Sequence, residues 1–284
     1  MIISIASGKG GTGKTTVATN LALSIGAGVQ LLDCDVEEPN AHLFLNPAIK
    51  KTEPVIAAVP SIDLEKCTFC RKCMEICRFN ALAVLKSDVM VFETLCHSCG
   101  GCSEICPENA ISEIPRTLGY VKLGTASDIG FVNGQLDVGQ VMVPPIIKQV
   151  RTHTDPDGIT IIDAPPGTSC PVIAAMNKAD FVLLVTEPTP FGLHDLKLAV
   201  ETVKILQLPH GLVINRAGMG NDGVRQYAEQ EKIPILMEIP FDRKIAEVYS
   251  SGQMVVEQIS GYREQFIALY AAIQNCVENK GDAK

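Results

Sequence analysis

The sequence predicts an α/β protein: a doubly wound, mostly parallel sheet with a smaller α+β module inserted into it. Apolar strands alternate with helical stretches from Ile2 to Ile25 and again from Ile159 to the end of the chain, which is typical of a parallel sheet covered by helices on both faces. A cysteine-rich segment interrupts this alternation, and 284 residues are enough for both parts. We expect the sheet domain at residues 1–60 and 115–284, and the insert at residues 61–114.

The first strand leads into a glycine-rich motif. Ile2 to Ala6 is apolar, residues 8–15 follow the pattern G-x4-G-K-T, and a helix with an apolar stripe follows from Lys14 to Ile25. Such a P-loop binds ATP or ADP with Mg²⁺, because its backbone amides, a lysine and a helix N-terminus face the phosphates while a hydroxyl binds the metal. The expected nucleotide-binding residues are Gly8, Gly10, Gly11, Thr12, Gly13, Lys14, Thr15 and Thr16, with the Thr15 hydroxyl on Mg²⁺.

A second lysine, Lys9, lies inside the loop. The form Lys-Gly-Gly-x-Gly-Lys-Thr-Thr resembles the MinD/ParA group of P-loop ATPases, which includes the nitrogenase iron protein. The resemblance implies ATP hydrolysis in a nucleotide-dependent homodimer, in which Lys9 reaches the phosphates bound to the second copy and acts with Lys14. Without the resemblance, Lys9 has a simpler interpretation as a solvated basic residue near phosphate.

Two further strands end in aspartates. Val29 to Leu32 runs into Asp33-Cys34-Asp35, and Ile159 to Ile162 runs into Asp163-Ala-Pro-Pro-Gly167. Carboxylates at the carboxyl ends of parallel strands lie beside the P-loop in a doubly wound sheet. The resemblance implies that Asp35 positions the attacking water, that Asp163 holds Mg²⁺ and that Gly167 belongs to a mobile switch. A strand-end turn or helix cap is the alternative for either aspartate.

Later strands carry a candidate adenine pocket. Gly211 to Asn215 and the strand before Pro240-Phe241-Asp242 both end in polar or turn-forming residues. By the same resemblance, Asn215 reads the base edge and the backbone from Pro240 to Asp242 closes over it. An ordinary turn role for Asn215 is the alternative.

Eight of the 11 cysteines form a duplicated pattern. The spacing C-x2-C-x2-C-x3-C occurs at residues 67–77 and 96–106, and the second run is followed by Pro107. This spacing indicates two 4Fe-4S clusters, in which three cysteines of one run bind one cluster and the fourth binds the other. The first ligand set is Cys67, Cys70, Cys73 and Cys106, and the second is Cys96, Cys99, Cys102 and Cys77.

Zinc and disulfides are the alternatives for these cysteines. Zinc needs only four ligands per ion and makes no use of the x2 and x3 spacings that complete each run. A disulfide framework requires an oxidising compartment, whereas the N-terminus lacks the features of a secretory signal, so we expect a cytoplasmic protein. The remaining cysteines, Cys34, Cys170 and Cys276, are expected to be small core residues.

Cys170 has a second interpretation. It lies seven residues after Asp163, and by resemblance to the nitrogenase iron protein a cysteine at this offset lies at the dimer face, at the end of the second switch. There it would bind a metal or couple the switch to the inserted clusters.

The connector and the C-terminus are expected to complete the fold. Residues 118–138 have the pattern of strands with a turn at Asn133-Gly134, and Val143 to Val150 that of a short helix. Tyr262 to Val277 has an apolar face but no basic enrichment opposite it, so we expect a helix packed on the sheet and not one lying on a membrane.

Charge and hydropathy exclude several partners. A net charge of −8 and a pI near 5.2 argue against a nucleic-acid surface. No apolar run approaches the roughly 18 residues of a membrane span, so no stable membrane insertion is expected.

Nearly the whole chain resembles the MinD-superfamily ATPases that contain an inserted two-cluster ferredoxin domain. This resemblance implies an energy-coupled electron-transfer protein with a protein redox partner. A carrier that delivers clusters or metals to an acceptor protein is the first alternative, and a redox-sensing regulatory switch is the second. Eight ligands in a complete ferredoxin pattern favour clusters that stay bound. No glutaminase domain or corrinoid site is readable, so an amidoligase activity is not expected.

Overall fold

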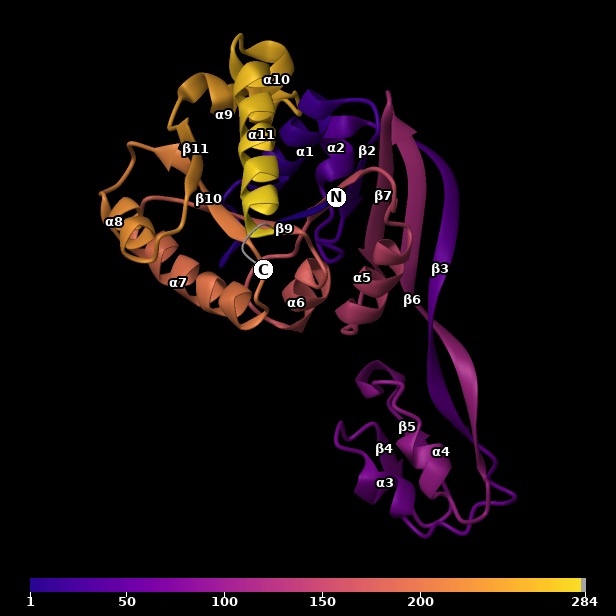
Figure 1. The fold of residues 1–284 in the computed structure, drawn as a ribbon. Helices are drawn as coiled ribbons and strands as arrows, with labels where there is room; N and C mark the ends of the chain where they lie inside the picture. The colour runs from indigo at the N-terminus through magenta and orange to yellow at the C-terminus, as the bar shows by residue number, and fades with distance from the viewer. Residues whose placement is uncertain (282–284) are drawn as a thin grey trace.

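A nine-stranded sheet forms the body of the protein in the computed structural model, which describes residues 1–281 (Figure 1). The strand order is β11-β10-β9-β1-β8-β2-β7-β6-β3. Neighbours from β11 to β7 are parallel, whereas β6 pairs antiparallel with β7 and β3. The predicted mostly parallel α/β sheet is confirmed. Its strands are β1 (Ile2–Ala6), β2 (Val29–Asp33), β3 (Ala48–Ile62), β6 (Ile111–Ala126), β7 (Ile129–Leu136), β8 (Ile159–Asp163), β9 (Phe181–Thr186), β10 (His210–Ala217) and β11 (Ile235–Pro240).

Helices cover both faces of the sheet. Successive strand residues face opposite sides, so Ile161 packs into one core and Ile162 into the other. One core lies under α5 (Val143–Thr152), α6 (Cys170–Met176), α7 (Pro190–Ile205) and α8 (Gly223–Gln230). The other lies under α1 (Lys14–Ile25), α2 (Ala41–Leu45), α9 (Arg243–Ser250), α10 (Val255–Gln258) and α11 (Tyr262–Gly281).

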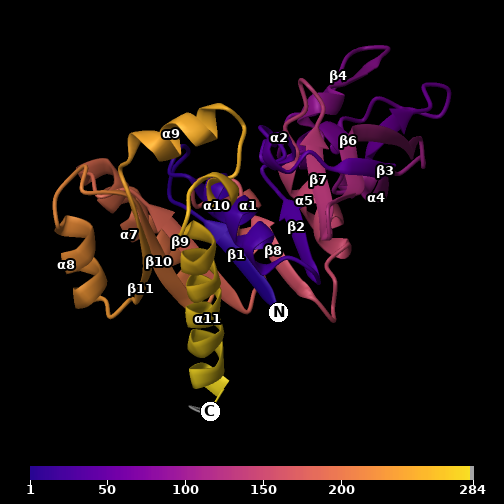
Figure 2. The same ribbon diagram turned by 90° about the horizontal axis from the view of Figure 1, so that it is seen from above.

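The C-terminal helix packs on the sheet, as predicted. Phe266, Leu269 and Ile273 of α11 are buried in the core that α1 also covers. Seen from above, α9, α10 and α11 group together, away from the far edge strand β3 (Figure 2). Among residues 1–281, no helix combines the length and the apolar character needed to cross a lipid bilayer.

The connector differs from its prediction in one respect. Strands and the helix α5 form where they were expected, but the turn at Asn133-Gly134 is wrong. Both residues lie inside β7, where Asn133 is buried and pairs with Asp33 of β2, and the chain turns instead at Ser127 and Asp128. The tertiary pairing of β7 with β2 overrides the local turn preference of the Asn-Gly pair.

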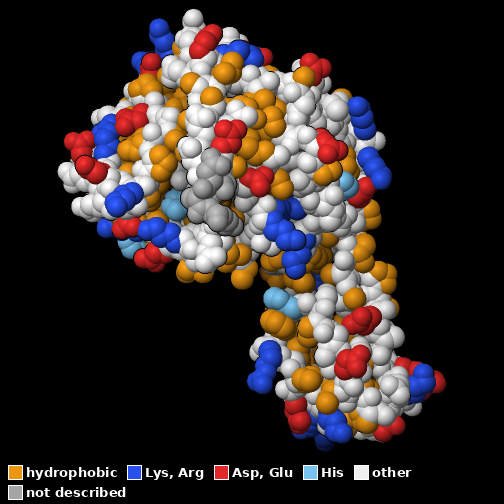
Figure 3. Space-filling view, viewed as in Figure 1, with side chains coloured by type: hydrophobic (Ala, Val, Ile, Leu, Met, Phe, Trp, Pro, Cys, Tyr) orange, Lys and Arg blue, Asp and Glu red, His pale blue; other side chains and the backbone are white. Residues whose placement is uncertain are grey.

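A long two-stranded ribbon carries the insert. β3 and β6 pair from Ala48–Thr125 to Ile62–Ile111, with two register shifts along the way, so they cross both expected boundaries of the insert and project from the body (Figure 1). Apolar side chains gather where the ribbon leaves the body (Figure 3), and the ribbon residues Ile56 and Ile114 are exposed. At the tip lie α3 (Lys72–Ile76), β4 (Leu82–Val84), β5 (Val89–Val91), a 3-10 turn (Glu93–Leu95) and α4 (Gly101–Ile105).

The tip has a very small apolar core. Leu82, Val84 and Val89 are its buried members, and half of the partly buried hydrophobic side chains around them are cysteines. A unit of this size normally needs a metal or disulfides to fold stably. The cysteines of the tip are therefore well placed to supply stability through a bound group.

Candidate functional site

The P-loop lies between β1 and α1 and begins the candidate nucleotide site. Gly13 has a φ of 98°, which favours glycine, and a Cβ there would lie 2.3 Å from the Asn215 amide nitrogen. Lys14 begins α1 with a largely buried side chain. The helix N-terminus thus faces the space where phosphates are expected.

Asp163 lies directly beside this loop. Its Oδ2 atom accepts a hydrogen bond of 2.6 Å from the Thr15 hydroxyl, and its Oδ1 atom is buried without a hydrogen-bond partner among residues 1–281. Burial raises the pKa of Asp163 to about 7, while the Thr15 bond and the Lys14 charge act in the opposite direction. An unpartnered carboxylate oxygen next to a threonine hydroxyl is the oxygen donor set that Mg²⁺ prefers.

Two aspartates follow β2. Asp33 is fully buried and accepts hydrogen bonds from the amides of Asp35 and Ala41; burial, and then the charge of Asp163, raise its pKa. Asp35 is less buried and lines the cavity next to the P-loop. Burial raises the pKa of Asp35 to about 6 against the effect of Lys14. Asp33 therefore fixes the loop, and Asp35 is the carboxylate available to a ligand.

A cavity of about 390 Å³ opens above these residues, within the usual size range of ligand sites. Of the predicted nucleotide residues, Gly8 and Thr12 lie outside its lining, because Gly8 packs against Asp195 and Thr12 is buried. The far wall is apolar and comes from α9 to α11, which the sequence analysis did not connect with the site. The predicted residues in its lining are Gly10, Gly11, Gly13, Lys14, Thr15, Thr16, Asp35, Asn215 and the segment Pro240, Phe241 and Asp242, and the added ones include Tyr249, Tyr262 and Phe266.

The Asn215 side chain lines the cavity and also makes two hydrogen bonds to the backbone. Its amide donates to the Thr12 carbonyl at 2.8 Å and accepts from the Arg216 amide at 2.9 Å. Asn215 thus ties the end of β10 to the P-loop, and base reading remains a prediction. Asp242 caps α9 by accepting from the Lys244 amide, so it serves as the helix cap as well as lining the cavity.

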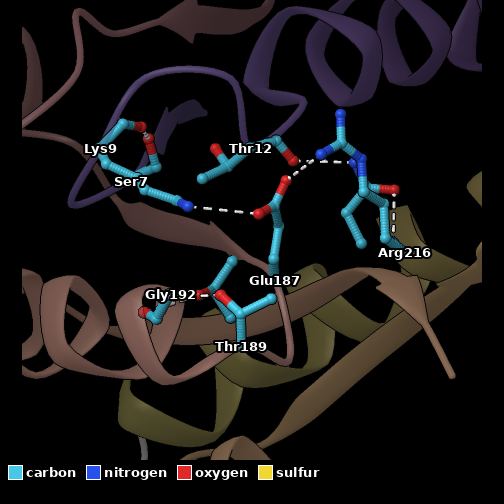
Figure 4. Close-up of polar contacts among 9 residues, drawn as sticks. Ser7, Lys9, Thr12, Glu187, Thr189, Gly192 and Arg216 are labelled. Atoms are coloured by element: carbon cyan, nitrogen blue, oxygen red, sulfur yellow. Dashed lines mark hydrogen bonds and ion pairs between the residues drawn. The ribbon is translucent and has the colours of Figure 1, made fainter. Parts of the chain in front are cut away.

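Lys9 contacts a residue that the sequence analysis missed. Its ammonium lies 3.3 Å from Glu187, whose other carboxylate oxygen accepts a 2.6 Å hydrogen bond from Arg216 (Figure 4). Glu187 comes directly after β9. The criterion that selected Asp163, an acidic residue at the carboxyl end of a parallel strand, would have found Glu187 as well.

The eight cysteines of the insert line two separate cavities in crossed sets. One cavity is lined by Cys67, Cys70, Cys73 and Cys106, and the other by Cys77, Cys96, Cys99 and Cys102. Each cavity thus has the cysteines of one predicted set in its lining, and the crossed ligation itself stays a prediction. Among residues 1–281, no three His, Cys, Asp or Glu side chains converge on a site for a single metal ion.

Backbone geometry repeats between the two halves of the insert. Left-handed residues occur at Phe69, Arg71 and Asn80, and at the equivalent positions Ser98, Gly100 and Asn109. In both halves an amide two residues after the first cysteine donates to its sulfur, at 3.4 Å for Cys67 and 3.5 Å for Cys96. The fourth cysteines, Cys77 and Cys106, each accept from an amide four residues later at 3.3 Å. Amides directed at thiolates stabilise the charge of a bound cluster.

The other cysteines differ among themselves. Cys34 is buried as expected, and Cys276 is partly buried beside the core that contains α11. Cys170 is exposed at the start of α6, so the prediction of a core residue is wrong there. Its side chain is available to solvent just beyond the loop that follows Asp163.

Comparison with known proteins agrees with the P-loop geometry. Residues 3–256 match the model of the CobQ/CobB/MinD/ParA nucleotide binding domain. The chain belongs to this family. As a CobQ/CobB/MinD/ParA protein it is a P-loop ATPase of the MinD/ParA type.

Relatives of this family member include proteins with iron–sulfur names. The uncharacterized protein MJ0578 of Methanocaldococcus jannaschii is 32% identical over 283 residues, covering 98% of each chain. An iron-sulfur cluster carrier protein of Pyrococcus horikoshii is 25% identical, covering 99% of this chain and 88% of the relative. The cell division ATPase MinD of Pyrococcus furiosus shares the fold, with a TM-score of 0.59 and 23% identity over 96% of this chain and 98% of that one.

Proposed function

We propose that the protein is an ATP-hydrolysing iron–sulfur protein, in which nucleotide state and homodimerisation control electron transfer through two 4Fe-4S clusters. The arrangement of the insert cysteines carries this proposal. Eight cysteines line two cavities in crossed sets of four, at the tip of a ribbon whose strands belong to the ATPase sheet. Such clusters supply one-electron redox chemistry.

The nucleotide residues have separate tasks in this proposal. Lys14 meets the β- and γ-phosphate charge, while the P-loop amides and the N-terminus of α1 bind the remaining phosphate oxygens. Thr15 and the free Oδ1 of Asp163 hold Mg²⁺. Asp35 orients the attacking water, and Lys9 contacts the phosphates bound to the second copy. The apolar wall with Tyr262 and Phe266 receives the base.

A chain of contacts supports coupling between nucleotide and insert. The loop after Asp163 leads into α6, where the Ala174 carbonyl accepts a 2.7 Å hydrogen bond from Arg151 of α5. At the end of α5, His153 lies 3.1 Å from Glu53 of β3. A movement of the loop after Asp163 therefore has a packed route through α6 and α5 to the ribbon that carries the clusters.

Anaerobic voltammetry tests the proposal. Cluster potentials are measured without nucleotide, with ADP and with a nonhydrolysable ATP analogue, each with Mg²⁺. We expect the analogue to shift at least one potential, since a change in dimer geometry alters cluster exposure, and exposure sets potential. Identical potentials in all three states would contradict coupled electron transfer.

Delivery of clusters or metals is a second candidate, because relatives of this chain are named iron-sulfur cluster carrier proteins. Anaerobic incubation with an apo-ferredoxin distinguishes the two. A carrier loses iron to the acceptor in an ATP-dependent manner, whereas an electron-transfer protein keeps its iron. For either function we expect a protein partner in the cytoplasm that accepts electrons or metal.

A further inference from the structure

Glu187 binds two cations from different parts of the nucleotide site. Its side chain is only 6% exposed, yet it carries a carboxylate. One oxygen lies 3.3 Å from Lys9 of the P-loop, and the other accepts from Arg216 after β10 at 2.6 Å. Figure 4 shows the carboxylate between the two cations. A buried carboxylate of this kind is costly unless it is paired.

The backbone holds Glu187 firmly in place. Its carbonyl accepts from the Thr189 amide at 2.8 Å, and Thr189 in turn caps α7 by accepting from Gly192 at 3.0 Å. A Cβ at Gly192 would lie 2.3 Å from the Glu187 carbonyl, so α7 packs directly against this residue. The carboxylate is therefore a fixed point toward which the longer, partly exposed Lys9 side chain turns.

We infer that Glu187 is a positioning residue that holds Lys9 withdrawn in the resting subunit. This inference rests on the proposed dimer, in which Lys9 contacts the phosphates of the second copy. One ammonium cannot be paired with Glu187 of its own chain and also reach across a dimer interface. The free-energy cost of breaking the Lys9–Glu187 pair thus opposes dimer formation.

Arg216 makes that release possible. When Lys9 leaves, Glu187 would be a buried charge without a partner if Arg216 did not remain bound to it. Arg216 also follows Asn215, which binds the Thr12 carbonyl of the P-loop, and both residues line the nucleotide cavity. Arg216, which lines the nucleotide cavity next to Asn215, therefore keeps the Glu187 carboxylate paired after Lys9 has moved away.

Two substitutions should change dimer formation in opposite directions. In Glu187→Gln the shape and one acceptor oxygen remain but the charge is lost, so the release of Lys9 costs less free energy than in the wild type. We expect the dissociation constant of the dimer formed with Mg²⁺ and a nonhydrolysable ATP analogue to fall about tenfold, equivalent to about 1.4 kcal/mol. In Arg216→Met the departure of Lys9 leaves the buried Glu187 carboxylate without a charged partner. We therefore expect the dissociation constant of the dimer to rise about tenfold or more.

The double variant separates this mechanism from a general loss of structure. The variant with both Glu187→Gln and Arg216→Met has no carboxylate at position 187 that could be left unpaired. We therefore expect its dimer to be at least as tight as that of the wild type. Analytical ultracentrifugation measures the dimer, and nucleotide affinity is measured in parallel so that constants are compared at equal occupancy. Glu238→Gln is the matched control, since Glu238 pairs with Arg225 at 2.6 Å outside the cavity lining; dimer formation should not change.

A chemical readout tests the resting subunit directly. Acylation of Lys9, followed by mass spectrometry on the nucleotide-free protein, should be several-fold faster in Glu187→Gln than in the wild type, because the amine is no longer held. Equal Lys9 labelling in both proteins, or a weaker dimer in Glu187→Gln, would overturn the proposed role of Glu187. Neither result would contradict the proposed nucleotide-dependent dimer itself. Faster labelling in a protein that forms no nucleotide-dependent dimer would support the resting contact but reject both the proposed dimer and the control of its formation by Glu187.

Discussion

The hydroxyl of Thr15 and the carboxylate of Asp163 are joined by a hydrogen bond of 2.6 Å, although 148 positions separate them in the chain. The bond connects the first turn of α1 to the end of β8 and leaves Asp163 Oδ1 buried without a partner among the described residues. Thr15 lines the nucleotide cavity beside Lys14, and its bond to Asp163 places a second oxygen-bearing side chain next to this end of the cavity.

The two loop lysines should have separable effects. Lys14→Ala should weaken ATP binding about 100-fold, because it removes a charge-assisted contact to the β- and γ-phosphates. Lys9→Ala should bind ATP nearly normally but lose hydrolysis and ATP-dependent dimerisation. Calorimetry, ATPase assays and light scattering measure these properties. A Lys9→Ala protein that dimerises and hydrolyses ATP like the wild type would rule out the proposed use of Lys9.

Stability of the nucleotide-free protein should depend on pH through Asp163. Its pKa is raised from 3.8 to about 7, so between these values the folded state retains a proton that the unfolded state has lost. The free energy of unfolding should therefore fall as the pH rises from about 4 to 7, by at most about 4 kcal/mol. Asp163→Asn should flatten this slope in urea titrations. An unchanged slope in that variant would assign the dependence to other groups, such as Asp33 and Asp35.

Crossed ligation should appear in single cysteine variants. Protein prepared anaerobically should contain about eight irons per chain, as expected for two four-iron clusters. Cys77→Ala should damage the cluster of Cys96, Cys99 and Cys102, with which Cys77 shares a cavity, and spare that of its own loop. Cys106→Ala is the reciprocal control. Mössbauer or EPR spectroscopy identifies the cluster that is lost, and loss of the Cys67-loop cluster in Cys77→Ala would disprove the assignment.

Removal of iron should unfold the tip of the insert and spare the ATPase domain. The apolar cluster of the tip has three buried members among the described residues, Leu82, Val84 and Val89, whereas the sheet has two large cores of its own. Hydrogen exchange after anaerobic chelation should show lost protection in residues 63–110 with little change in β1, β8 and α1. Loss of nucleotide binding after chelation would contradict this independence.

Cys170 should affect coupling and not cluster content. Cys170→Ser should retain iron and ATP affinity, because the cysteine is exposed and absent from both cysteine-lined cavities. We expect it to reduce the effect of nucleotide on cluster potential, because α6 begins there and packs toward α5. Wild-type coupling in this variant would leave Cys170 as an exposed residue without a role in the switch.

Much of the site could be predicted because its chemistry is local in sequence. The P-loop from Gly8 to Thr15 and the cysteine runs at 67–77 and 96–106 carry their geometry in fixed spacing. Their backbone turns need only a few residues, which is why the left-handed positions recur in both halves of the insert. The alternation of strands and helices likewise identified the sheet, since side-chain periodicity reports burial directly.

Tertiary structure decided what depends on long-range packing. Local sequence placed a turn at Asn133-Gly134, but pairing of β7 with β2 made these residues part of a strand. Cys170 appeared suited to the core, yet the docking of α6 leaves it exposed. The partnership of Lys9, Glu187 and Arg216 joins three segments whose contact has no sequence spacing to reveal it. Spacing along the chain thus determined which groups could bind phosphate and iron, whereas the order of strands in the sheet determined which charges meet.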